Sequence, residues 1–185
     1  MFKILDEACT PTRGTKYSAA IDLRSREDIT IGAGETVLIP LGVKIDLDLF
    51  VDTNYKSLAY VDNEEFEHWK QSHYLQLMLR SGLGKKGLIL PNGVGVIDLD
   101  YQDEIMMIVH NPICGVYQDF DDSFELEKIE LKETHTYNAA NNEVRYTIKK
   151  GDRVGQITLL EHKSYLFGVD SDEVRSGGFG STGSK

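Results

Sequence analysis

The sequence predicts an all-β domain, a barrel or a sandwich, because its apolar residues recur mainly with a period of two rather than 3.6. Short strands separated by turns that contain glycine and proline are typical of both architectures. A chain of 185 residues suits one compact domain. Its 41% apolar and 27% charged residues are ordinary for a globular protein. We therefore expect a single all-β domain over residues 1–175.

The expected strands follow one another along the chain. Alternating or continuous apolar residues mark strands at 29–31, 37–39, 43–49, 75–79, 105–109 and 157–160. In the third of these, the alternation continues through Leu47 and Leu49. The uninterrupted run at 105–109 indicates a strand that is buried on both faces.

One stretch, DNEEFEHWKQSHY at 62–74, has the features of a helix. Asp62 or Asn63 can cap it, acidic residues fill its first turn, and Phe66 and Trp69 share a face. The sequence therefore predicts one short helix in an otherwise all-β chain.

A second stretch, about 115–145, begins acidic and then predicts a β-hairpin. Its arms are expected at 124–136 and 144–148, joined by a turn in the Asn- and Ala-rich segment NAANN.

The last ten residues, 176–185, are expected to form a flexible glycine-rich arm. A disordered terminus is the simpler interpretation. The single aromatic residue there, Phe179, favours an arm that closes over a ligand, with the ring stacked on a flat group.

Charge and composition exclude several classes of function. The formal net charge of −10 argues against a protein that binds a nucleic-acid backbone. No apolar run is long enough for a membrane span, and the N-terminus lacks the pattern of a signal peptide. Cys9 and Cys114 form neither a metal-binding spacing nor a disulfide framework. We therefore expect a cytoplasmic location, which would be the host cytoplasm for a viral or phage protein.

Two segments offer groups that bind phosphate. The residues Gly82–Gly87 match G-x-G-x-x-G, but no crossover helix can follow them, so a dinucleotide site is rejected. Arg80, Ser81 and Gly82 instead provide a guanidinium, a hydroxyl and an accessible backbone N–H for phosphate oxygens. A solvated arginine beside a turn serine is the alternative. Further on, Gln156 lies in an apolar strand and needs a partner, whereas Asp152 and Arg153 could be a surface ion pair.

Asp98 and Asp100 are the candidates for acid–base chemistry. Spaced by two, they would share one face of a strand, opposite Ile97 and Leu99. A carboxylate near an apolar floor can act as a general base. A solvated acidic turn is the alternative.

Five segments, in order, resemble the motifs of the trimeric dUTP pyrophosphatase (dUTPase) family. They are AAIDL at 19–23, RSGL at 80–83, GVIDLDY at 95–101, GDRVGQ at 151–156 and GGFGSTG at 177–183. The resemblance covers most of the chain outside about 50–74 and 115–145, which look like two insertions. It implies a jelly-roll-like, distorted β-barrel subunit that forms a homotrimer with active sites at the subunit interfaces.

The resemblance also implies an enzyme, a dUTP diphosphatase, with Mg²⁺ bound to the triphosphate and to water rather than directly to the protein. Hydrolysis of dUTP to dUMP and pyrophosphate would keep uracil out of DNA and supply dUMP for dTMP synthesis. Asp98 would activate the water that attacks the α-phosphorus, and Asp22 would be a supporting carboxylate that orients an arginine. The remaining implied roles are phosphate binding by Arg80, Ser81, Gly82 and Gln156, uracil recognition by Asn92 and Gly95, sugar packing by Tyr101, uracil stacking by Phe179, and terminal-phosphate contacts by Arg175, Gly180 and Ser181.

The sequence departs from the family's pattern at four places. Ala20 replaces the usual glycine, Leu79 a common proline, and Asp103 a frequent glycine. Arg175 lies four residues before Phe179 rather than the usual five, so its reach to a phosphate would depend on the glycine-rich arm.

Two other functions compete with this interpretation. A dCTP deaminase would share the fold but would need a different set of proton-transfer groups. A protein that acts mainly through a partner bound to the 115–145 insertion belongs to another class, and a hairpin that only extends the trimer is the simpler explanation of that insertion.

Overall fold

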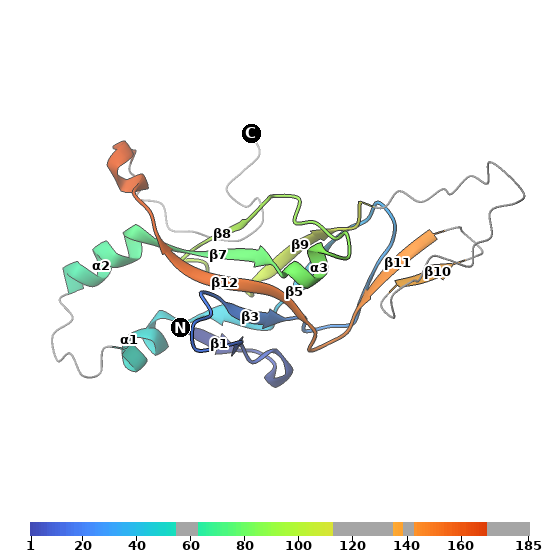
Figure 1. The fold of residues 1–185 in the computed structure, drawn as a ribbon. Coiled ribbons are helices and arrows are strands. Elements are labelled where there is room, and N and C mark those ends of the chain that lie inside the picture. The colour runs from blue at the N-terminus through green and yellow to red at the C-terminus, as the bar shows by residue number, and fades with distance from the viewer. Residues whose placement is uncertain (55–62, 113–134, 139–142, 170–185) are drawn as a thin grey trace, which may run out of the picture.

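The structure of the chain is a computed structural model, and it describes residues 1–54, 63–112, 135–138 and 143–169 (Figure 1). The strands are β1 (Phe2–Ile4), β2 (Thr12–Arg13), β3 (Ile21–Arg24), β4 (Ile29–Ile31), β5 (Thr36–Pro40), β6 (Val43–Ile45), β7 (His73–Leu79), β8 (Gly95–Asp98), β9 (Met106–His110), β10 (His135–Asn138), β11 (Glu143–Ile148) and β12 (Arg153–Glu161). The helices are α1 (Leu47–Asn54), α2 (Asn63–Ser72) and α3 (Ser81–Gly84), with single 3-10 turns at Glu7–Cys9 and Ser164–Phe167.

The strands pair only in antiparallel fashion in the described part of the chain, as expected for an all-β protein. The largest sheet has the order β2-β3-β12-β7-β8, and the others have the orders β10-β11-β4, β1-β6 and β5-β9. β12 is the middle strand of the largest sheet, and it pairs with β3 on one side and with β7 on the other. This arrangement brings three segments that are far apart in the sequence side by side.

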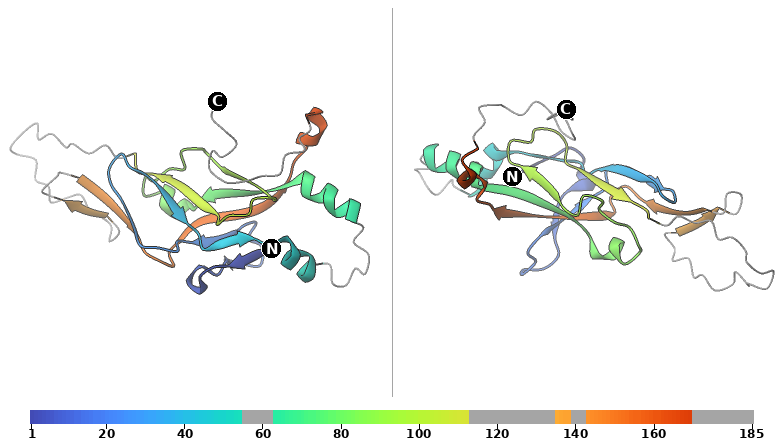
Figure 2. Two further views of the ribbon diagram at one scale, coloured as in Figure 1. Left: turned by 180° about the vertical axis from the view of Figure 1, so that it is seen from behind. Right: turned by 90° about the horizontal axis from the view of Figure 1, so that it is seen from above.

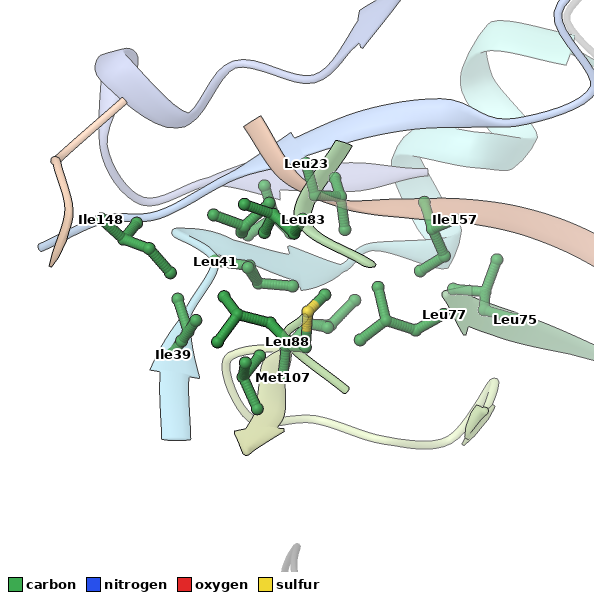
Figure 3. Packing of buried hydrophobic residues seen from close by; sticks show 14 of the residues in the cluster. Leu23, Ile39, Leu41, Leu75, Leu77, Leu83, Leu88, Met107, Ile148 and Ile157 are labelled. Carbon is green, nitrogen blue, oxygen red and sulfur yellow. The ribbon is translucent and has the colours of Figure 1, made fainter. Parts of the chain in front are cut away.

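The core lies between these sheets. Leu23 and Ile157 from the largest sheet meet Ile39 of β5 and Met107 of β9, and all four side chains are at most 2% exposed (Figure 3). Burial of such side chains is the main stabilising contribution to the fold. The expected strand at 105–109 is confirmed as β9, but its burial on both faces is not: Met107 and Val109 on one face are fully buried, whereas Met106 and Ile108 on the other are half-buried.

The predicted helix at 62–74 is confirmed as α2, except that His73 and Tyr74 already belong to β7. In α2, Trp69 stacks on Phe66 at 5.7 Å and on Phe50 of α1 at 4.9 Å between ring centroids. The contact between Trp69 and Phe50 joins the two helices at one end of the molecule (Figures 1 and 2).

The expected strand at 43–49 is wrong beyond Ile45, because α1 begins at Leu47. The Leu49 N–H donates to a carboxylate oxygen of Asp46 at 2.8 Å, and the Phe50 N–H donates to the Asp46 carbonyl at 3.2 Å. An aspartate that caps the first turn in this way favours a helix over an extended strand. The structure therefore has a helix that the alternation of Leu47 and Leu49 concealed.

The predicted hairpin is present where the structure describes it. β10 and β11 pair from His135 opposite Tyr146 to Asn138 opposite Glu143, and β11 also pairs with β4. The hairpin lies at the end of the molecule opposite α1 and α2 (Figures 1 and 2). The rest of its expected first arm, 124–134, lies outside the described residues, so the proposed role of the 115–145 insertion in partner binding stays a prediction. None of the helices in the described part of the chain is long and apolar enough to span a membrane.

Candidate active site

Asp22 of β3 is the centre of a cluster of donors. Its side chain is 4% exposed. One of its carboxylate oxygens forms an ion pair with Arg80, 3.0 Å from Nε, and accepts from Gln156 Nε2 at 3.1 Å, and the other accepts from Arg153 Nη1 at 3.2 Å. Charge-assisted hydrogen bonds of this kind are short and directional, so one carboxylate fixes two guanidinium groups and an amide.

The strand order explains why these four residues meet. Gln156 on β12 is paired with Asp22 on one side and with Met78 of β7 on the other. Arg80 comes two residues after Met78, and therefore on the same face of the sheet. Gln156 thus has the partner that its place in an apolar strand required.

Arg153 reaches the same carboxylate through an irregularity in β12. On a regular strand, residues three apart point to opposite faces. The register of β12 with β3 shifts between Arg153 and Gly155, and such a bulge redirects a side chain. At Gly155, a Cβ atom would lie 2.7 Å from Met107 Cε and 3.1 Å from Leu77 Cδ1, so a larger residue would have to displace these core side chains.

The residues after Arg80 offer further donors. α3 begins at Ser81, and the first N–H groups of a helix have no acceptor within the helix. Ser81 and Gly82 are exposed, and a Cβ atom at Gly82 would meet nothing within 4 Å. An anion can therefore approach this backbone closely.

A second group of predicted residues surrounds a separate pocket of about 210 Å³. Its lining includes Asn92, Gly95, Ile97, Tyr101 and Met106. At Gly95, a Cβ atom would lie 3.0 Å from Leu77 Cβ, so a larger residue would crowd the neighbouring strand. The Tyr101 ring is 8% exposed, and its hydroxyl donates to the Glu104 carbonyl at 3.1 Å. A narrow pocket with an aromatic wall suits a flat ring and its sugar.

Asp98 is the last residue of β8 and begins a turn. The Tyr101 N–H donates to the Asp98 carbonyl at 3.1 Å, so Asp100 lies in the turn and not on the strand. The expectation that Asp98 and Asp100 share a strand face is therefore wrong, although Leu99 is buried between them as expected. Both aspartates line an open pocket of about 640 Å³ together with His73 and Lys70.

Asp98 and the Asp22 cluster are far apart within one chain. Asp98 is paired with Tyr74 near the start of β7, whereas Arg80 follows Leu79 at its other end. At a rise of about 3.4 Å per residue, the six residues from Tyr74 to Arg80 span roughly 20 Å. A single chain does not bring Asp98 to the donors of the Asp22 cluster.

The remaining predicted residues, Arg175, Phe179, Gly180 and Ser181, lie outside the described residues. Their roles stay predictions.

No model of a protein family matches the sequence, but individual relatives do. The chain is 31% identical over 196 residues to the deoxyuridine 5'-triphosphate nucleotidohydrolase of Hydrogenovibrio crunogenus, covering 99% of this chain and 95% of that protein. It is 30% identical over 197 residues to the enzyme of the same name from Hahella chejuensis, covering 100% and 97% of the two chains. The chain belongs to the dUTPase family.

Solved dUTPases have the same fold. The dUTPase of Streptococcus mutans matches with a TM-score of 0.54 and 24% identity over 92% of this chain and 98% of its own. The dUTPase of Staphylococcus bacteriophage 80alpha matches with a TM-score of 0.58 and 20% identity over 97% of each chain. At this identity the likeness establishes the all-β dUTPase fold and no more.

One residue of the cluster, Arg153, was not among the predicted site residues of this dUTPase. The alternative of an ion pair with Asp152 is wrong, because Arg153 binds Asp22. Asp152 instead accepts the Lys149 N–H at 2.9 Å and closes the turn before β12. The bulge that redirects Arg153 depends on packing around Gly155, and a motif alone does not reveal it.

Proposed function

We propose that the chain hydrolyses dUTP to dUMP and pyrophosphate, with Asp98 activating the water that attacks the α-phosphorus. Membership of the dUTPase family supports the substrate. The observation that carries the mechanism is the Asp22 cluster, which holds Arg80, Arg153 and Gln156 in one place on a chain whose net charge is −10. The reaction would remove dUTP from the DNA precursors and supply dUMP for dTMP synthesis.

In this proposal, the chain provides position and charge, as phosphoryl transfer mainly requires. Arg80, Ser81, Gly82 and Gln156 bind the phosphate oxygens. As the water oxygen bonds to the α-phosphorus, its proton passes to the Asp98 carboxylate. The bond from the α-phosphorus to the bridging oxygen breaks, and pyrophosphate leaves with its charge stabilised by the donors.

The pocket of about 210 Å³ would hold the nucleoside. Asn92 and the backbone at Gly95 would read the uracil edge, and the Tyr101 ring would pack under the sugar. Phe179 would stack on uracil, with Arg175, Gly180 and Ser181 near the terminal phosphate.

The roughly 20 Å between Asp98 and Arg80 supports a site that is shared between copies of the chain. We propose a homotrimer in which Asp98 of one subunit faces the Asp22 cluster of another. This arrangement makes turnover depend on assembly.

Mg²⁺ would be held by the triphosphate and water. Among the described residues, Asp22 is the one buried carboxylate, and three donors already occupy it. In the same part of the chain, no three His, Cys, Asp or Glu side chains gather into a metal site. An ion that arrives with the substrate would offset the negative charge of the phosphates. A mutant dUTPase from phage phi11 of S. aureus coordinates a structural Mg(II) ion.

The proposed function is tested by measuring pyrophosphate and ammonia released from dUTP, dTTP, dCTP and UTP. We expect pyrophosphate from dUTP and much slower release from the other three, because the base and sugar pockets select uracil and exclude a 2′-hydroxyl. Ammonia from dCTP without pyrophosphate from dUTP would establish a deaminase and refute the proposal.

A mixing experiment tests the shared site. Asp98→Asn and Arg80→Ala should each be inactive alone, because each lacks one half of every site. Co-refolded at equal concentrations, they should recover a fraction of wild-type turnover, since mixed assemblies pair an intact Asp98 with an intact Arg80. Each variant refolded with itself is the control. Recovery no greater than these controls would show that both residues act within one chain.

A further inference from the structure

A pocket of about 310 Å³ adjoins the Asp22 cluster and includes residues to which the reaction above gives no role. Its polar lining comprises Arg80, Gly82, Lys86, Tyr146, Asp152 and Arg153. Lys86 follows α3, and Tyr146 belongs to β11, the second arm of the hairpin.

Lys86 is fixed in this pocket by Tyr146. Its ammonium donates to the Tyr146 hydroxyl at 3.1 Å and lies 5.3 Å from the centroid of the same ring. Tyr146 is 3% exposed and is itself held in register opposite Ile31 of β4. An ammonium has three donors, so this hydrogen bond leaves donor capacity directed at the pocket.

The charges that line the pocket favour an anion. Lys86, Arg80 and Arg153 contribute three cations. The one carboxylate in the lining, Asp152, is engaged by the Lys149 N–H. Lysine binds phosphate as a compact point charge, beside the planar forks of the arginines.

We propose that Lys86 binds the terminal phosphate of the substrate and that Tyr146 is its positioning residue. The inference rests on the proposed function, which already places a triphosphate at Arg80 and Gly82. It adds a substrate contact that depends on the hairpin, because the hydroxyl that orients Lys86 comes from β11. The competing account is structural: Lys86 would serve only to satisfy the Tyr146 hydroxyl.

The test compares nucleotides with and without the outer phosphates. Binding of dUpNHpp, a dUTP analogue with a nitrogen bridge, and of dUMP is measured by calorimetry for the wild type, Lys86→Met and Lys85→Met. Loss of a charge-assisted hydrogen bond should weaken dUpNHpp binding to Lys86→Met by about tenfold or more and leave dUMP binding unchanged. Lys85 is exposed and lines none of these pockets, so Lys85→Met, with the same change of charge, should bind both as the wild type does.

Tyr146→Phe keeps the ring and removes the hydroxyl, so it should raise KM for dUTP with little change in kcat, and by less than Lys86→Met. Lys86→Arg should recover part of the dUpNHpp affinity. Thermal unfolding of each variant accompanies the binding data. A Lys86→Met protein that unfolds at a lower temperature yet binds dUpNHpp as the wild type does would overturn the inference and support the structural account. A wild type that binds dUpNHpp but releases no pyrophosphate from dUTP would instead count against the proposed function.

Discussion

Asp98→Asn is expected to fold and bind dUpNHpp as the wild type does while its kcat for dUTP falls by roughly 10²–10⁴-fold, the usual contribution of a general base. The amide has almost the same shape as the carboxylate but cannot take the proton of the attacking water. Because Asp98 is exposed at the end of β8, the substitution removes no buried contact from the core.

The matched control is Asp100→Asn, an exposed aspartate two residues further along the same turn that lines the same pocket of about 640 Å³. It should retain wild-type kcat. The two variants are compared by steady-state pyrophosphate release and by calorimetric binding of dUpNHpp. Equal turnover in Asp98→Asn and the wild type would remove Asp98 from the mechanism.

Asp22→Ala should have the largest combined effect on stability and activity. Removing one partner of a buried ion pair costs about 3–5 kcal/mol. The lower end of that range applies here, because the side chains of Arg80 and Arg153 are 28% and 46% exposed and water can solvate them. Without Asp22, neither guanidinium nor the Gln156 amide keeps its position, so kcat/KM should fall by several orders of magnitude.

One further variant separates charge from packing at Asp22, and a second variant, at Asp28, serves as the surface control. Asp22→Asn keeps the size and an acceptor oxygen, and it should lose less free energy of unfolding than Asp22→Ala while still raising KM. Asp28→Asn changes an exposed carboxylate that pairs with Lys149, and it should change stability little, because surface ion pairs are screened by water. Urea unfolding and kinetics of all three test the assignment. An Asp22→Ala protein as stable and active as Asp28→Asn would contradict it.

The described structure also shows where local sequence patterns predict correctly and where they do not. The strand at 105–109 and helix α2 were predictable, because a short apolar run suits a strand and an amphipathic stretch with acidic residues in its first turn suits a helix. Leu47 and Leu49 were misinterpreted because their alternation fits a strand. The Asp46 carboxylate accepts the Leu49 N–H and so stabilises the first turn of a helix instead.

At the site, the residue types and their order are readable from local motifs: a carboxylate in GVIDLDY, phosphate donors in RSGL and an amide in GDRVGQ that needed a partner. Strand pairing between distant segments determines which of these groups meet. Asp22 gathers Arg80, Gln156 and Arg153 because β12 pairs with both β3 and β7 and because its bulge turns Arg153 onto the shared face. Asp98, in contrast, stays at the far end of β7. Its distance from the cluster follows from the length and register of a strand, which backbone hydrogen bonds between distant segments fix and which no single motif contains.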